Sequence, residues 1–372
     1  MKNKKFILLI WIALTAFGIL AIYSVSIYES FQITLKMVAK WHMNNASNYY
    51  YFFKQLISLV VWVIIATGVY FLPIKKIQEH KNKIFFWAVI LQLLVFTPLG
   101  IELNWSRWWL YISWLGTLQP AEIFKLAFVM FLAWWLVKKK DLLDNFKGFI
   151  MFGFVIWIFF LIFLKIPDLW TLLVLWPVAL VMYWYGWWNI KYIITTMILW
   201  IVFWLTIWMQ FHYIRERIEY FINPNVDESW RWISWQITQS LISIWWGGTF
   251  GKWYGKWLQK FGYIPEAQSD FVFAAFSEEI WFFWDMILIL LYFFLGFTFL
   301  KNSEEVKNPY YKNLGIWIIS LILLQAIVNM WVNVKLLPLT WLTLPFVSYW
   351  WTALMINFVE LILLYKIVIW KD

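Results

Sequence analysis

The sequence predicts an all-α polytopic membrane protein with about ten transmembrane helices and one large extracytoplasmic loop, within a single domain spanning 1–372. Hydrophobic residues make up 64% of the chain and charged residues only 13%, against roughly 25% charged in a soluble domain. Apolar segments of about 20 residues, enough to cross a bilayer, alternate with short lysine-rich runs. This composition excludes an ordinary soluble enzyme, and the absence of cysteine excludes disulfides and thiolate chemistry.

Ten segments of the chain fit a membrane span by length and hydropathy. They are 6–27, 53–72, 84–99, 120–137, 148–164, 168–186, 190–211, 276–300, 313–333 and 344–367.

The distribution of lysines orients these spans. Lysines gather before the first span and in the connections near 75–83 and 138–147, whereas the short connections on the other side hold few. By the positive-inside rule both termini are cytoplasmic. The net charge of +10 is therefore explained by membrane topology, and we expect no nucleic-acid partner.

The segment 212–275 is the large extracytoplasmic loop, placed before the eighth predicted span. A connection of this length in a compact protein is usually functional. It contains Lys252, Glu266 and Asp270. Asp270 is a candidate general base, with lysines that could meet an anionic substrate. The alternative is that Asp270 caps the following helix.

Two further groups of residues lie at predicted span boundaries. Glu122 and Lys125 are three residues apart at the start of the fourth span, so they share one helix face. They either contact substrate or form a neutralising ion pair. Asp168 is predicted to be a helix N-cap. Pro338 and Pro345, which precede Ser348, predict irregular backbone lining a cavity.

Five stretches of the chain, in this order, resemble those of the SEDS family (shape, elongation, division and sporulation), which includes RodA and FtsW. They read NWSRWW, QPAEIFK, IPDLWT, QSLISIWWGGTFGKWYGKWLQKFGYIPEAQSDFVFAAFSEEIWFFW and LLPLTWLTLPFVSYWW. The stretch QKFGYIPEA is closer to the division member, FtsW, than to RodA. Gln268 and Ser269 stand where the family has His and Thr.

The resemblance implies a peptidoglycan glycosyltransferase that polymerises lipid II in the bacterial cell membrane. Its essential aspartate falls on Asp270, its glutamate–lysine pair on Glu122 and Lys125, and its loop arginine on Arg107. Lys252, Glu266 and Ser348 are further candidates for binding substrate.

The resemblance also implies substrates and partners. Lipid II and the growing glycan linked to undecaprenyl pyrophosphate are the expected substrates, and a divalent cation, Mg or Mn, is compatible with that chemistry. A class B penicillin-binding protein and other divisome or elongasome proteins are the expected partners. The alternative functions are a flippase for the lipid-linked precursor, which ten spans with intramembrane charges also fit, and a membrane scaffold.

Tryptophan, usually the rarest residue, outnumbers glycine in this chain, with 34 Trp against 14 Gly. Eleven tryptophans occupy glycine positions of the family motifs: Trp105, Trp170, Trp245, Trp253, Trp257, Trp281, Trp284, Trp331, Trp341, Trp350 and Trp351. Tryptophan cannot replace glycine in a tight turn or a close helix contact. We hypothesise that UGA codons read as glycine in the source organism were translated here as tryptophan. Deliberate engineering or a Trp-rich lineage is the alternative.

Overall fold

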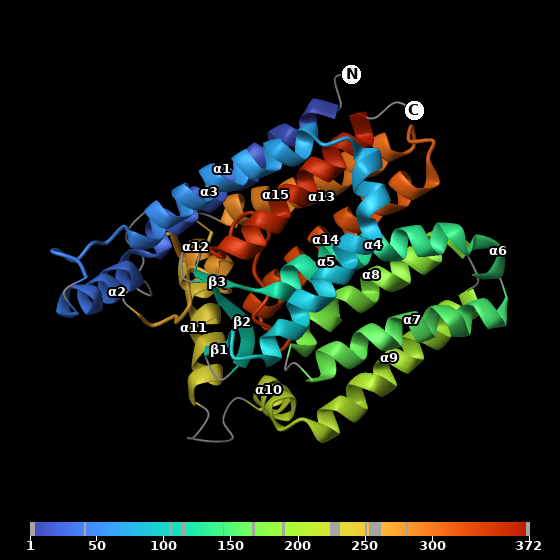
Figure 1. Cartoon of the computed structure of the whole chain (residues 1–372). Coiled ribbons are helices and arrows are strands. Elements are labelled where there is room, and N and C mark those ends of the chain that lie inside the picture. Colours follow the sequence, from blue (N-terminus) through green and yellow to red (C-terminus); the bar gives the residue numbers. More distant parts are fainter. Residues whose placement is uncertain are drawn as a thin grey trace.

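The chain was analysed as a computed structural model, which describes residues 4–40, 42–103, 106–112, 116–143, 145–165, 168–187, 190–223, 231–249, 251–252, 262–279 and 282–369. It confirms the predicted class, because tilted helices form nearly all of the molecule (Figure 1).

Seven helices of the described residues are long and apolar enough to cross a membrane. They are α1 (Lys4–Val25), α3 (Tyr50–Phe71), α5 (Pro120–Lys138), α7 (Phe146–Lys165), α13 (Phe282–Ser303), α14 (Pro309–Asn333) and α15 (Trp351–Ile369). The other three predicted spans correspond to α4 (Ile74–Leu93), α8 (Leu169–Trp187) and α9 (Ile190–Gln210). Helix α4 begins ten residues earlier than predicted, directly after Pro73, and includes the lysines of 75–83.

Several shorter elements lie between the long helices. Helix α2 (Ile27–Ala39) follows α1 almost without a break, and α6 (Lys140–Leu143) links α5 to α7. A 3-10 turn, η1 (Leu94–Phe96), leads into an antiparallel sheet of β1 (Gly100–Leu103), β2 (Ser106–Ile112) and β3 (Gly116–Leu118). The predicted outer segment contains α10 (His212–Ile222), α11 (Arg231–Gly247) and the start of α12 (Val272–Glu279).

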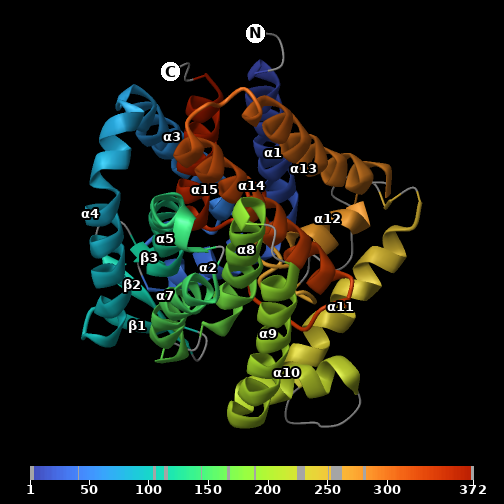
Figure 2. The ribbon, with the colours of Figure 1, turned by 90° about the vertical axis from the view of Figure 1, so that its right-hand side faces the viewer.

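The core of the bundle is built around α14. This helix contacts α5, α8, α13 and α15, and α5, α14 and α15 are the most deeply buried of the candidate spans. Figure 2 shows α14 between α15 and α8. Most of α14 is therefore buried, whereas Ile327 and Trp331 remain exposed.

Both chain ends lie at the same end of the bundle, and α10 lies at the opposite end (Figures 1 and 2). Lys4 joins the two ends, since its Nζ donates to the backbone carbonyl of Val368 at 2.7 Å and lies 3.3 Å from a carboxylate oxygen of Glu305.

Two irregular segments, 262–271 and 334–350, precede α12 and α15, and their later parts, 267–271 and 342–348, are buried. The last predicted span therefore starts at 351 instead of 344, because Pro345 and a turn closed by hydrogen bonds from Val347 and Ser348 to the Leu344 carbonyl keep this stretch non-helical. Likewise, α12 and α13 are separate helices where one span from 276 was predicted.

Helix α1 packs directly against the second irregular segment. A Cβ at Gly18 would lie 2.6 Å from the backbone oxygen of Phe346, closer than real side chains approach. Only glycine allows this contact between the first helix and the segment that carries Ser348.

Candidate functional site

Asp270 lies near the end of the first irregular segment, two residues before α12, and its side chain is buried. Among the described residues its Oδ1 atom has no hydrogen-bond partner. In the first turn of α12, the backbone N–H of Ala274 donates to a side chain of α14, Asn333 Oδ1, at 3.1 Å. Within the described part of the chain, Asp270 Oδ1 therefore makes no capping hydrogen bond to α12.

Burial raises the pKa of Asp270 to about 7, and the negative charge of Glu266 contributes to the rise. A hydrogen bond from Trp350 and the positive charge of Arg217 act in the opposite direction. A carboxyl group with a pKa near neutrality can accept a proton from a hydroxyl group at physiological pH.

The backbone around Asp270 is held by α14. The Nδ2 atoms of Asn329 and Asn333 both donate to the Asp270 carbonyl oxygen, at 2.9 and 3.0 Å. All three residues are buried. A buried backbone carbonyl needs a hydrogen-bond partner, and these two amides supply it for Asp270.

Hydrogen bonds from the second irregular segment hold the first one in place. Ser348 Oγ donates to the Ser269 carbonyl oxygen at 2.5 Å and accepts from Leu344 N at 2.8 Å, and Tyr349 N donates to the Gln268 carbonyl at 2.9 Å. Ser348, predicted to contact substrate, thus uses its hydroxyl to join the two segments.

Glu266 lies four residues before Asp270 in left-handed backbone, with φ of 55°. Its backbone N–H donates to Glu29 Oε1 on α2 at 3.1 Å, and its own carboxylate accepts from Ser269 Oγ at 3.3 Å. Nothing in the sequence alone indicates a role for Glu29, because it lies outside the ten predicted spans.

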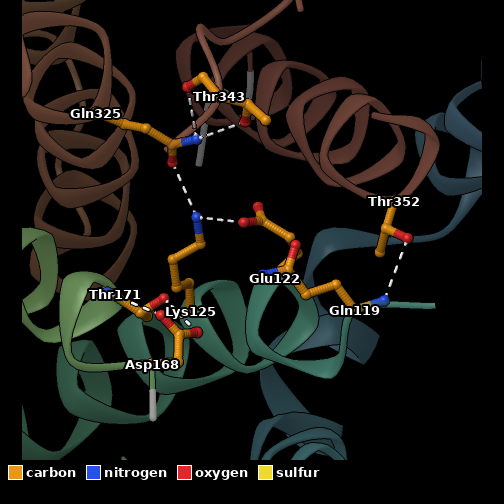
Figure 3. Close-up of polar contacts among 8 residues, drawn as sticks. All are labelled: Gln119, Glu122, Lys125, Asp168, Thr171, Gln325, Thr343 and Thr352. Atoms are coloured by element: carbon orange, nitrogen blue, oxygen red, sulfur yellow. Dashed lines mark hydrogen bonds and ion pairs between the residues drawn. The ribbon is translucent and has the colours of Figure 1, made fainter. Parts of the chain in front are cut away.

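Glu122 and Lys125 form a buried ion pair with 2.8 Å between Lys125 Nζ and Glu122 Oε1. Lys125 also donates to Gln325 Oε1 at 2.9 Å, and Gln325 Nε2 donates to the carbonyl of Thr343 at 3.1 Å (Figure 3). The side chain of Lys125 is only 2% exposed. The geometry favours the neutralising ion pair over direct contact with substrate.

Asp168 lies beside this pair in Figure 3 and caps α8 as the sequence predicts. Its carboxylate accepts from the backbone N–H of Thr171 at 3.2 Å and from the Thr171 hydroxyl at 2.8 Å. These are the bonds that a helix N-cap makes.

Arg107 and Lys252 are not brought into these contacts. Arg107 lies exposed on β2, where Nη2 donates to the Thr97 carbonyl at 2.6 Å and Nε to the Gly100 carbonyl at 3.3 Å. Lys252 is exposed, 5.1 Å above the Trp246 ring. Their roles in binding substrate remain predictions.

Arg217 of α10 is a buried cation near Asp270. The sequence alone does not predict its role. Its Nη1 donates to the Leu339 carbonyl at 2.7 Å, and its guanidinium lies 3.9 Å from the ring centroid of Trp341 and 5.2 Å from that of Trp170. One signal was available, because Arg217 lies in the same charged outer segment as Asp270.

Several of the tryptophans at glycine positions cluster around the site. Trp341 has φ of 51°, a conformation typical of glycine. Trp350 stacks on Trp109 of β2, with centroids 4.5 Å apart. Trp105, Trp253, Trp257 and Trp281 lie outside the described residues.

Across the described residues, no group of three histidine, aspartate or glutamate side chains is placed to hold a metal ion. The carboxylates of Glu266 and Asp270 interact electrostatically, and we assign no metal to them.

Comparison with known proteins decides the family. A family model described as "Cell cycle protein", for FtsW, RodA and SpoVE, matches residues 4–371. The chain belongs to the SEDS family. It is 28% identical to the probable peptidoglycan glycosyltransferase FtsW of Nitrosomonas europaea, over 95% of this chain and 89% of that protein. It is 32% identical to the stage V sporulation protein E of Bacillus subtilis, over 70% of each.

Solved structures of SEDS-type chains have the same fold. A chain of a peptidoglycan synthase complex aligns with a TM-score of 0.78 at 19% identity, covering 97% of this chain and 96% of that one. RodA of Thermus thermophilus aligns with a TM-score of 0.63 at 19% identity, covering 98% and 96%. The apolar helices and the family together make this SEDS chain a multi-pass membrane protein.

Proposed function

We propose that this chain is a peptidoglycan glycosyltransferase that polymerises lipid II, with Asp270 as the general base. The observation that carries the proposal is a buried carboxyl group with a pKa near 7, placed in the motif that matches the SEDS aspartate. The names of the FtsW relatives support the reaction class.

In the proposed reaction, the 4-hydroxyl of the incoming lipid II GlcNAc attacks the anomeric carbon of the growing strand. A new C–O bond forms there as the bond to undecaprenyl pyrophosphate breaks, and the leaving group takes the bonding electron pair. Asp270 accepts the hydroxyl proton. Arg217 is buried near Asp270, where its positive charge opposes the rise in the pKa of that carboxyl group.

We further propose that both termini are cytoplasmic, so that Asp270 works at the outer face of the membrane. The lysine distribution supports this orientation, and the shared location of the two chain ends agrees with it. A class B penicillin-binding protein is the proposed partner, since the matched complex is described as coordinating polymerization and crosslinking. The similarity to FtsW supports a role in division.

The test is reconstitution in vesicles that contain lipid II. Two chains are compared: the printed one, and a glycine-restored chain with Gly at the eleven tryptophan positions named above. We expect glycan strands from at least one chain and none from its Asp270→Asn variant, which should still fold. Transbilayer movement of lipid II without polymerisation would replace this proposal with the flippase. Polymerisation by Asp270→Asn would refute the role of Asp270.

A further inference from the structure

Three amide side chains form a row along one face of α14. Gln325, Asn329 and Asn333 are spaced four residues apart, which places them above one another on a helix. All three are buried. A buried amide is costly unless it is hydrogen-bonded, so the partners of these three side chains show what the row holds in place.

Each amide in the row fastens an irregular segment. Gln325 Nε2 donates to the backbone carbonyl of Thr343, and Asn329 Nδ2 donates to that of Leu342 at 2.6 Å. Asn329 and Asn333 also converge on the Asp270 carbonyl. The row therefore holds both segments of the site against the same helix.

Both polar atoms of the Asn333 side-chain amide make hydrogen bonds. Its Nδ2 donates to the carbonyl of Asp270, while its Oδ1 accepts from the backbone N–H of Ala274 in the first turn of α12. This one side chain fixes the peptide after Asp270 and the helix that follows. Two donors on a single carbonyl oxygen restrict rotation of the peptide unit that carries the Asp270 side chain.

The row also reaches the buried ion pair. Lys125 Nζ donates to Gln325 Oε1, so Glu122, Lys125 and Gln325 form one polar cluster at the deep end of the row. At its other end the row meets Asp270. Helix α14 thus spans the distance between the two charged parts of the protein that the sequence motifs single out.

We propose that Asn329 and Asn333 are positioning residues for the proposed reaction, which hold the Asp270 carboxylate in its working orientation through their hydrogen bonds to the Asp270 backbone. The inference rests on the proposed function. It assigns neither amide to substrate. Because catalysis is sensitive to misplacement of a reacting group by about 1 Å, the effect should appear in kcat.

The test uses Asn329→Ala, Asn333→Ala and the double variant, made in whichever of the printed and glycine-restored chains polymerises lipid II faster. We expect kcat to fall about 10-fold in each single variant and about 100-fold in the double variant, with the KM for lipid II within about twofold of the parent. Asn302→Ala is the matched control, because this buried amide of α13 donates to Thr298 in its own helix.

The pH profile separates positioning from a general structural role. A loosened segment admits water to Asp270 and weakens the burial that raises its pKa, so the acid limb of kcat should move to lower pH. Folded protein is quantified by thermal unfolding in detergent before each assay. If the double variant does not fold, the single variants decide, since each keeps one donor to the Asp270 carbonyl.

Unchanged kcat and an unchanged acid limb in folded Asn329→Ala and Asn333→Ala would overturn the inference. An equal loss of kcat in Asn302→Ala would also overturn it. If the parent chain itself forms no glycan strands in either version, the proposed function fails instead, and the two failures are distinguished by the parent alone.

Discussion

Glu29 and Gln268, which lie 239 residues apart in sequence, are joined by a hydrogen bond of 3.0 Å from Gln268 Nε2 to Glu29 Oε2. The other carboxylate oxygen of Glu29 accepts from the backbone N–H of Glu266. One side chain of α2 thus clamps the segment that carries Asp270 at two points.

Removing this clamp should loosen the segment. We expect Glu29→Ala to lower the free energy of unfolding by about 1–3 kcal/mol, because it deletes two hydrogen bonds to a charged acceptor, and to reduce polymerisation. Thermal unfolding and the lipid II assay measure the two effects. Glu102→Ala, a change at an exposed glutamate of β1, is the control and should leave both values unchanged. Equal behaviour of the two variants would contradict the clamp.

The raised pKa of Asp270 predicts how rate and stability depend on pH. A general base must be deprotonated, so the rate should fall about tenfold per pH unit below pH 7. Between pH 4 and 7 the folded protein holds a proton on Asp270 that the unfolded chain has lost, so stability should decrease as pH rises through this window.

Asp270→Asn removes this dependence, because asparagine does not titrate. A rise in pKa from 3.8 to about 7 corresponds to ~4 kcal/mol, an upper bound for the stabilisation expected of Asp270→Asn at pH 8. At pH 4 the variant and the parent should be equally stable. Thermal unfolding at both pH values tests this, and a variant that is less stable than the parent at pH 8 would argue against a raised pKa of Asp270.

The buried pair of Glu122 and Lys125 predicts a strong asymmetry between single and double variants. Lys125→Met leaves the Glu122 charge uncompensated and should cost about 3–5 kcal/mol. The double change Glu122→Gln with Lys125→Met removes both charges and should recover most of that loss. Unfolding measurements on purified protein check this.

Activity of the same double variant distinguishes the two roles left open by the sequence. Polymerisation that recovers together with stability indicates a structural ion pair. A stable double variant without activity would show that one of the charges contacts substrate.

The backbone at Trp341 predicts the identity of the residue in the native protein. A φ of 51° costs a bulky residue about 1–3 kcal/mol, whereas glycine adopts it freely. We expect peptide mass spectrometry of the native protein to find glycine at 341, 350 and 351. Tryptophan at 350 and 351 would rule out the recoding hypothesis.

The pKa of the Asp270 carboxyl group also depends on Trp350, because a hydrogen bond from Trp350 lowers it. A chain with glycine at 350 loses this hydrogen bond. The acid limb of its rate profile should therefore lie at higher pH than that of the printed chain.

Most of the helix bundle could be predicted from the sequence, because long apolar segments and lysine runs are strong signals in a membrane protein. The sheet of β1, β2 and β3 could not be predicted because its strands are only three to seven residues long. Helix α2 was missed because its apolar residues are interrupted by Glu29, Gln32 and Lys36.

The candidate site was only partly predictable. Motifs point to Asp270, Glu122 and Lys125, but hydrogen bonds between distant segments cannot be read from a pattern. Asn329 and Asn333 left one usable signal, two amides four residues apart inside an apolar span. The hydrogen bond from Ser348 to the first segment depends on the local backbone conformation. Pro345 predicts that this backbone is irregular but does not predict its conformation.

The hydrogen bond between Ser348 and Ser269 has a consequence for biosynthesis. The site needs Glu29 from the beginning of the chain, Asp270 from its third quarter, and a segment that leaves the ribosome only shortly before the last helix. A nascent chain that has not yet released 334–350 lacks the bonds that fix Asp270. We therefore expect polymerase activity to arise only on completed chains, so that a truncated product cannot build wall material without control.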